Sequence, residues 1–346
     1  RTGEVVGFRD VNAYGSVKGG VYPRTVTDTE VAVAMPFSSV TGESTVTADV
    51  AGSFTYSGGT ISSGLDGQFF RTACEACSGP AQAEASVALG SGRLDFGLGG
   101  LDGVANGFST PAERNAYYHL NQVRLVVKKW LSIPWLESNI GINVNIQDTC
   151  NAVWTGEANF FRSGDGCNNT GEISDVMYHE WGHGLDGNTR GGDGATGEGT
   201  ADVVSMHVTR SPLVGPYFRT NGSPVRNIDF ATSSRGFLSV ANIASKCSTA
   251  GSTGPLGYEV HCEGEIYGQT GWDLSQALTA KHGHHTGWRV SERIFFNSLP
   301  DAGSYLSTGS FPIYDAYVNA DDDNGNLADG TPNGQEIFDA FDAHGI

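Results

Sequence analysis

The chain has 346 residues and 38% of them are hydrophobic, so it is long enough for two globular domains, each with a core of its own. Its formal net charge of −18 argues against nucleic acid and anionic membranes as partners and favours the binding of cations. No apolar run approaches the ~18 residues of a membrane-spanning helix, and the start at an arginine instead of a methionine predicts a processed or trimmed chain.

Residues 1–105 are expected to form a β domain. They are rich in Gly, Ser, Thr and Val and contain alternating segments such as EVAVAM at 30–35 and GSFTYSG at 52–58. The string TVTADVAGSFTYSGG at 45–59 resembles the transthyretin-like or carboxypeptidase-regulatory type of β-sandwich repeat. This resemblance implies a packing or presenting role for the domain. The glycine-rich segment 90–107 is the expected boundary.

A helix is predicted to begin at residue 111. Thr110 is its expected N-cap, Pro111 suits the first helical position, and Glu113 completes a capping box with Thr110. The apolar face of this helix, which we expect to pack on the core, consists of Ala116, Leu120, Val123, Val127 and Trp130. Two short β segments follow, INVNIQ at 142–147 and NAVWTGEANFF at 151–161.

The stretch 177–202 carries most of the chemistry. His179 and His183 are four residues apart, so on a helix both imidazoles share a face and can reach one zinc ion. Glu180 lies beside His179 on this helix, where its carboxylate can take a proton from a metal-bound water. The alternative is a chance match on an ordinary helix, with both histidines solvated or satisfied by local hydrogen bonds.

A catalytic zinc ion needs three protein ligands and an open position for water, so a third ligand is required. A third histidine after a glycine turn is excluded, because Asp186 and Thr189 occupy the positions that this pattern needs. The other route is a second helix with Glu198 and, one turn later, Asp202. Here the sequence resembles the gluzincins, the thermolysin-like and fungalysin-like zinc endopeptidases. The resemblance implies that Glu198 is the third ligand and that Asp202 fixes the tautomer of His179.

Further pieces of the gluzincin pattern lie before the zinc helix. The string NAVW, followed by SGDG and ISDVMYHEWGH, resembles the edge strand of thermolysin and its approach to the zinc helix. An edge strand can pair with an extended peptide, so Asn151 and Ala152 are candidates for binding the substrate backbone, with an ordinary buried strand as the alternative. Asp175 resembles a calcium ligand of thermolysin-like enzymes, although stabilisation of the helix dipole explains it equally well.

Two more candidates lie beyond the metal helices. Arg226 resembles the gluzincin arginine that hydrogen-bonds a substrate carbonyl, with a surface salt bridge as the alternative. His261 follows a valine at the entry of an apolar helix and resembles the gluzincin histidine that stabilises the tetrahedral oxyanion, with a structural histidine as the alternative. Two positions depart from thermolysin. Gly194 stands where a tyrosine is found, and Gly197 replaces the asparagine that precedes the ligand glutamate.

The acidic run YVNADDDNGNLADGTPN at 317–333 is dense in oxygen ligands. Calcium suits such a loop because it accepts several carboxylates and carbonyls in a flexible geometry, and Asp321, Asp323 and Asp329 are its candidate ligands. The loop is not an EF-hand, since position twelve from Asp321 is Pro332 and not a glutamate. The alternative is a solvated acidic loop before a last helix at 335–344.

Six cysteines, an even number, fit an oxidising compartment, and their spacings do not form the paired CxxC arrangement of a structural zinc site. Proximity in the sequence is the guide to pairing. It favours Cys74 with Cys77, Cys150 with Cys167, and Cys247 with Cys262. The first pair could instead be redox-active, but no thioredoxin-like pattern surrounds it.

These patterns predict an α+β protein with an N-terminal β-sandwich-like domain at 1–105 and a gluzincin catalytic domain at 106–346, the latter with a mixed sheet and a mainly helical C-terminal lobe. The predicted function is that of a secreted, monomeric zinc endopeptidase that acts on proteins or peptides, with calcium as a second candidate ion. Two alternatives stay open. One is an exopeptidase of the same clan, which needs a charged group to bind a free terminus. The other is a non-catalytic adhesin or binding module on this fold.

Overall fold

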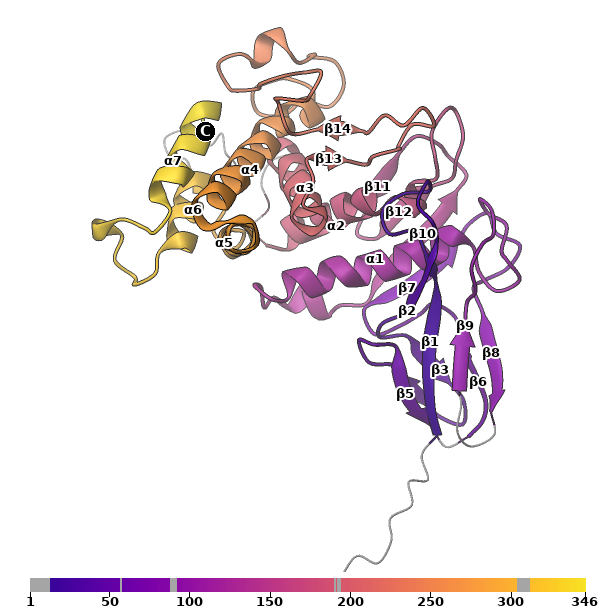
Figure 1. Ribbon diagram of the computed structural model, residues 1–346. Coiled ribbons are helices and arrows are strands. Elements are labelled where there is room, and N and C mark those ends of the chain that lie inside the picture. The colour runs from indigo at the N-terminus through magenta and orange to yellow at the C-terminus, as the bar shows by residue number, and fades with distance from the viewer. Residues whose placement is uncertain (1–12, 57, 88–91, 190, 192–193, 304–311) are drawn as a thin grey trace, which may run out of the picture.

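The computed structural model describes residues 13–56, 58–87, 92–189, 191, 194–303 and 312–346. Among the described residues, every regular element before residue 100 is a strand, and helices dominate from Ser174 onward (Figure 1). The long helix α1, Pro111–Val127, crosses the middle of the molecule between the N-terminal strands and the other helices (Figure 1). The predicted α+β class is therefore confirmed.

Two four-stranded sheets build the N-terminal part. In the first, β1 pairs antiparallel with β2 and β5 and parallel with β9. The second has the order β4-β3-β6-β8 and is antiparallel. The alternating segments of the sequence form β2 and β5, and the alternation in β5 buries Phe54. The strands are Ala13–Val21 (β1), Val31–Ala34 (β2), Ser39–Thr41 (β3), Thr45–Thr47 (β4), Ser53–Tyr56 (β5), Gly59–Ser63 (β6), Ala83–Val87 (β8) and Gly92–Asp95 (β9).

A third, mixed sheet lies beside the metal helices, in the order β11-β12-β10-β7. β10, Ile140–Ile146, is parallel to both of its neighbours, and its nearly continuous burial is typical of a central strand. β11, Ala152–Trp154, is the edge strand and pairs antiparallel with β12, Ala158–Phe161. β7, Phe70–Cys74, comes from the N-terminal part, so the sheet joins the two halves of the chain.

Helix α1 begins as its sequence indicates. Thr110 Oγ1 accepts a hydrogen bond from the Glu113 amide at 3.3 Å, and Glu113 Oε2 accepts one from the Thr110 amide at 2.7 Å. This capping box satisfies amides that would otherwise lack a partner at the helix start. Four residues of the predicted apolar face are fully buried, namely Ala116, Leu120, Val123 and Val127. Trp130 packs against the core. The helix α1 lies against the helix α2 and the strands β7 and β10.

Glycines let the helices α2 and α3, which carry the candidate metal ligands, and the helix α4 approach one another closely. A Cβ atom at Gly182 of α2 would lie 2.7 Å from Ala201 Cα of α3, and one at Gly199 of α3 would lie 2.7 Å from the Gly264 carbonyl oxygen of α4. Larger side chains at these crossings would push the backbones apart. These and the remaining helices are Ser174–Asn188 (α2), Gly194–Thr209 (α3), Val260–His282 (α4), His284–Ser298 (α5), Pro312–Asp321 (α6) and Gly334–His344 (α7).

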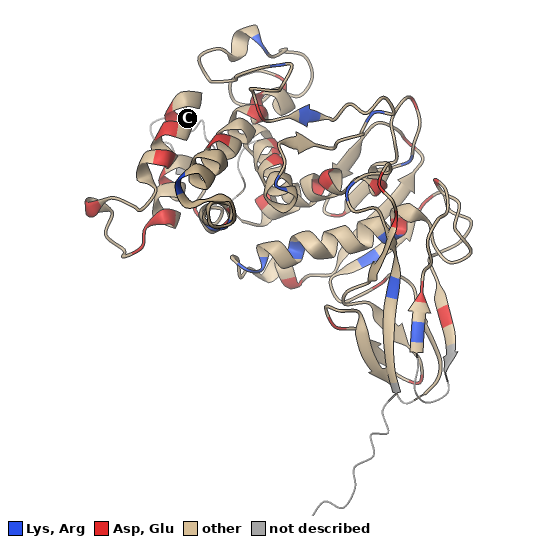
Figure 2. Cartoon of the chain, viewed as in Figure 1, with Lys and Arg blue, Asp and Glu red and all other residues tan. Residues whose placement is uncertain are grey.

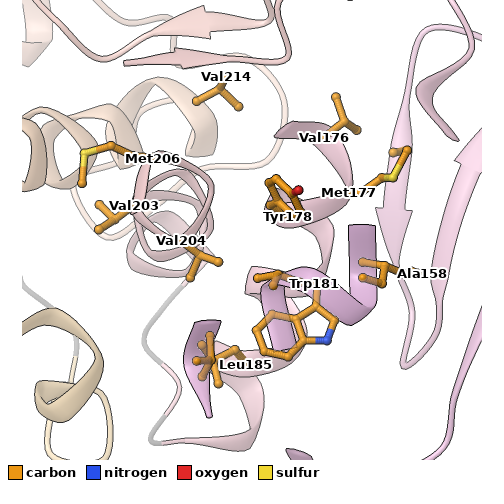
Figure 3. Close-up of a cluster of buried hydrophobic side chains, with 14 of the residues drawn as sticks. Ala158, Val176, Met177, Tyr178, Trp181, Leu185, Val203, Val204, Met206 and Val214 are labelled. Atoms are coloured by element: carbon orange, nitrogen blue, oxygen red, sulfur yellow. The ribbon is translucent and has the colours of Figure 1, made fainter. Parts of the chain in front are cut away.

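Apolar side chains pack around the helices α2 and α3 and the neighbouring strand β12. Figure 3 shows Val204 of α3 on the side of Trp181 and Leu185 of α2, Val203 on the opposite side of α3, and Ala158 of β12 on the other side of Trp181. All five side chains are at most 1% exposed. Deeply buried apolar packing of this kind fixes the two helices relative to each other and to the sheet.

The segment between α3 and α4 is rich in loops. It contains the short hairpin of β13, Leu213–Val214, and β14, Arg226–Asn227. Four short 3-10 turns occur among the described residues: Pro134–Glu137, Thr170–Glu172, Ile243–Ser245 and Leu327–Asp329.

All six cysteines form disulfides, and the three pairs are those that sequence proximity favours. Cys74 ends β7 and bonds to Cys77, while Cys150, just before β11, bonds to Cys167. The third bond joins Cys247 to Cys262 in the first turn of α4. Within the described ranges, none of the helices is both long and apolar enough to cross a membrane.

Candidate metal centre

The two histidines of α2 and the glutamate of α3 converge. His179 Nε2 lies 3.1 Å from His183 Nε2 and 3.4 Å from Glu198 Oε2, and His183 Nε2 lies 3.6 Å from Glu198 Oε1. Zinc–ligand bonds of about 2.0–2.1 Å in a tetrahedron place ligand atoms about 3.3 Å apart. The three side chains therefore have the donor types and the spacing of a zinc site, and they form one of the groups able to hold a metal ion.

Asp202 supports the first of these histidines. Its Oδ1 lies 2.9 Å from His179 Nδ1, one turn along α3 from Glu198, and its side chain is fully buried. Burial disfavours the charged imidazole, but the hydrogen bonds to Asp202 and Glu198 outweigh burial and raise the pKa of His179 to about 9. A carboxylate at Nδ1 directs Nε2 of His179 toward the metal position.

Arg226 of β14 is part of the same cluster. Its Nε and Nη2 lie 2.6 Å and 2.9 Å from the two oxygens of Asp202, and Nη2 lies 3.2 Å from Glu198 Oε2. The side chain is only 8% exposed, so this is a buried ion pair and not the surface salt bridge that was the sequence-based alternative. Burial would raise the pKa of Asp202, but the Arg226 charge outweighs it and the pKa falls. Sequence patterns do not reveal this pairing, which spans 24 residues.

The second histidine has a different environment. The place that a Cβ at Gly197 would take lies 3.3 Å from Asp186 Oδ2 and 4.0 Å from His183 Nδ1. Because Gly197 has no side chain, the space beside the His183 ring stays open. Asp186 of α2 lies next to this space. Burial and the neighbouring His179 charge lower the pKa of His183 to about 4, so this imidazole is neutral and able to bind a metal.

Glu180 lies in the wall of the cleft next to the metal group. It is 6% exposed, and burial raises its pKa to about 7. The charge of His179 lowers this pKa, whereas the charge of Glu198 raises it. A carboxylate with a pKa near the working pH can both accept and return a proton. It lines the same cleft as the three side chains of the metal group.

His261 approaches the same group from α4. Its Nε2 lies 3.3 Å from Glu198 Oε1, and its Nδ1 lies 2.6 Å from Glu259 Oε1. The side chain is 51% exposed and lines the cleft. Glu259 is the N-cap of α4, and its carboxylate also accepts the Cys262 amide at 3.0 Å. Sequence analysis missed Glu259, although an acidic residue directly before a helix was an available N-cap signal.

These side chains border an open cleft of about 740 Å³. Asn151 and Ala152, at the start of the edge strand β11, line this cleft together with Glu259 and His261. β11 pairs on one side only, so the strand can accept a further strand on the side away from β12. Tyrosine does not occur among the described residues that line this cleft, in keeping with Gly194 at the position where thermolysin has one.

Two of the predicted calcium ligands are paired with arginine side chains in the structure. Asp175 is fully buried and accepts Arg24 Nε at 3.0 Å and Nη2 at 2.6 Å, so an arginine from the N-terminal part takes the place that calcium would need. Asp321 is fully buried too, and its Oδ1 accepts Arg293 Nη2 and Asn333 Nδ2, each at 2.8 Å. Calcium could bind at either position only if these hydrogen bonds were replaced, and calcium binding by Asp175 and Asp321 stays a prediction.

Asp323 and Asp329 are exposed in the loop between α6 and α7, where Figure 2 shows acidic residues. Asp329 Oδ2 accepts Asn324 Nδ2 at 3.1 Å. Among the described residues, these carboxylates do not belong to a group able to hold a metal ion. Calcium binding by these two residues stays a prediction.

Comparison with known proteins gives the class of the fold. The model resembles the solved structure of a metalloproteinase, and the His179, His183 and Glu198 group fits a site of the gluzincin type. That structure is the precursor of protealysin from Serratia proteamaculans, with a TM-score of 0.53 and 16% sequence identity over 74% of this chain and 83% of that chain. Sequence comparison finds no matching family model and no similar curated protein. The likeness is therefore one of fold.

Proposed function

We propose that the chain is a secreted zinc-dependent endopeptidase of the gluzincin type. The observation that carries the proposal is the convergence of two imidazole nitrogens and one carboxylate at spacings of 3.1–3.6 Å beside a buried glutamate. His179, His183 and Glu198 would hold the ion. The metalloproteinase fold of the similar structure and the three disulfides, which suit an extracellular compartment, support it.

Bound zinc supplies a Lewis acid that polarises a carbonyl group and lowers the pKa of water. Glu180 accepts the proton of the attacking water and then delivers it to the leaving amine. His261 donates a hydrogen bond from Nε2 to the carbonyl oxygen as negative charge develops there. Glu259, 2.6 Å from Nδ1 of His261, accepts the Nδ1 hydrogen and orients the ring, and Nε2 is the second donor when both ring nitrogens carry a hydrogen.

The substrate is proposed to bind as an extra strand beside β11. Asn151 and Ala152 would bind its backbone through groups that the sheet leaves free. Arg226 uses Nε and Nη2 for Asp202, which leaves Nη1 for a substrate carbonyl. An interior peptide segment needs only these backbone contacts, so endopeptidase activity is favoured over exopeptidase activity.

The remaining predictions belong to the same proposal. Residues 1–105 would form a supporting β-sandwich-like domain and residues 106–346 the catalytic domain, although β7 crosses from the first into the sheet of the second. The protein would act as a monomer on protein or peptide substrates. Asp323 and Asp329 would contribute to calcium binding in the loop before α7.

Metal analysis and peptide cleavage together test the proposal. We expect about one zinc ion per chain, cleavage of internally quenched peptides blocked at both ends, and loss of cleavage on chelation. Glu180→Gln should retain zinc and lose activity by a factor of about 10² to 10⁴. Glu84→Gln, at an exposed position of β8, serves as the matched control.

Three results would contradict the proposal in different ways. A native chain without zinc would favour a non-catalytic binding module, whereas cleavage that survives Glu180→Gln would refute the role of Glu180 as the base. Cleavage only of peptides with a free terminus would favour the exopeptidase.

A further inference from the structure

We propose that Arg219 determines the substrate preference of this cleft by binding a carboxylate of the peptide. The carboxylate can belong to an acidic side chain or to the C-terminus of the peptide, since both offer the same chemistry. The inference rests on the proposed peptidase function, because it concerns a substrate bound in the same cleft.

Three arginines line the cleft, and Arg219 differs from the other two. Arg226 is paired with Asp202, and Arg235 Nε lies 3.0 Å from Glu265 Oε2. Arg219 has no carboxylate within 4.0 Å among the residues that the structure describes. The chain has 38 acidic residues and only 20 basic ones, so acidic partners are plentiful. An arginine without one at the substrate cleft is free to pair with a ligand.

The contacts of the Arg219 guanidinium leave most of its donors available. Nη1 lies 3.0 Å from Cys167 Sγ and 3.3 Å from Cys150 Sγ, and the guanidinium carbon lies 5.6 Å from the centre of the Phe218 ring. Sulfur is a weak acceptor, whereas a guanidinium carries five N–H donors in a planar fork. A carboxylate matches this fork with two parallel hydrogen bonds.

Hydrogen bonds hold the backbone of Arg219 in place. The Arg219 amide donates to the Ser223 carbonyl at 3.1 Å, and its carbonyl accepts the Gly222 amide at 2.9 Å. A bridge pairs Arg219 with Cys167, whose disulfide partner Cys150 lies two residues before the start of β11. Arg219 is thus fixed both by its own turn and by the segment that leads into the edge strand.

This position relates Arg219 to the path of the substrate. A peptide that pairs with β11 extends past Asn151 toward Cys150, and Arg219 lies at that end of the strand. Successive residues of a strand advance by about 3.3 Å, so a carboxylate in only one or two adjacent positions of the peptide can meet the guanidinium. Val214, Val225 and Phe218 line the same part of the cleft, and their apolar surfaces strengthen an ion pair by excluding water.

A glutamate-versus-glutamine scan tests the inference. Each position of an internally quenched, doubly blocked peptide would carry Glu or Gln in turn, and kcat/KM would be measured for both. A second pair of peptides, with neutral side chains, would compare a free C-terminal carboxylate with an amide. We expect the native protein to prefer the carboxylate about fivefold at one or two adjacent positions, and to do so less at high salt.

Variants then assign the preference to Arg219. Arg219→Gln should reduce the Glu/Gln ratio to about one, and Arg219→Glu should invert it, since like charges repel. Arg289→Gln, at an exposed position of α5, is the matched control and should leave the ratio unchanged. Because each ratio compares two substrates on one variant, a smaller folded fraction does not alter it.

The outcomes separate this inference from the proposed function. A native ratio of one at every position and at the C-terminus, with all peptides cleaved, overturns the inference and leaves the peptidase proposal intact. A preference that persists in Arg219→Gln also overturns it. Cleavage of neither member of any pair overturns both.

Discussion

The absent side chain of Gly264 is what allows α4 to approach the ligand Glu198. A Cβ atom at Gly264 would lie 2.7 Å from Glu198 Cβ and 2.7 Å from the Ala195 carbonyl oxygen, both on α3. Ordinary contact begins at 3.4 Å, so Gly264→Ala has to move the two helices apart by about 0.7 Å. Neither contact is the flexible end of a side chain, so the strain cannot be relieved by a rotamer change.

The consequences follow from the size of that movement. Overpacking of this kind costs about 1–3 kcal/mol of the free energy of unfolding. The displaced element carries Glu198, whose oxygens lie only 3.4 Å and 3.6 Å from the two histidine nitrogens. We expect zinc affinity to fall by about 10- to 100-fold, as for changes to the support of metal ligands. Misplacement of about 1 Å can cost about 10²-fold in rate, so kcat/KM should fall comparably.

Zinc competition with a chelator, peptide cleavage and thermal unfolding of the metal-free chain would measure these effects. Gly187→Ala is the matched control, because it lies on the histidine helix α2 and a Cβ there meets nothing within 4 Å. Alanine favours a helix over glycine by up to about 1 kcal/mol, so this variant should be as stable as the native chain or more so. Equal zinc affinity and activity in the two variants would refute the argument from helix spacing.

Three further predictions concern buried charges. Asp202→Asn should weaken zinc binding about 10- to 100-fold, because it removes the charge that orients His179 and pairs with Arg226. A zinc affinity within twofold of the native value would contradict this prediction. Arg24→Met should cost about 3–5 kcal/mol in urea unfolding by leaving Asp175 buried and unpaired, and adding Asp175→Asn should restore most of the loss. Burial raises the pKa of Glu172 from 4.5 to about 8, so the folded chain keeps a proton that the unfolded chain loses as pH rises. Stability should therefore fall by up to about 5 kcal/mol between pH 4.5 and 8, and Glu172→Gln should remove that part of the pH dependence in urea titrations.

Local signals account for what the sequence predicts well. The spacing of His179 and His183 within one helix, and of Glu198 and Asp202 within the next, fixes which side chains share a face. The capping box at Thr110 depends on residues three apart. These features need no knowledge of how distant segments meet.

Long-range pairings account for what the sequence does not predict. Arg24 meets Asp175 across 151 residues, and β7 joins β10 in one sheet although about seventy residues separate them. Asp321 looked like a calcium ligand because it stands in an acidic run, but helix packing brings Arg293 to its carboxylate. Composition cannot distinguish an acidic residue that faces solvent from one that faces a buried guanidinium, because only the tertiary fold decides between them.

Charge balance explains why Arg226 belongs to the metal centre. With neutral imidazoles, Glu180, Glu198 and Asp202 bring three negative charges into a site where each is at most 9% exposed. Three unbalanced buried carboxylates would be very costly, and Arg226 compensates one of them. Two negative charges remain, which is the charge that one divalent cation neutralises. A monovalent ion would leave the site negative, so under the proposed function the arginine would adjust the buried charge to a divalent zinc ion, whose tetrahedral geometry the spacing of the three side chains fits.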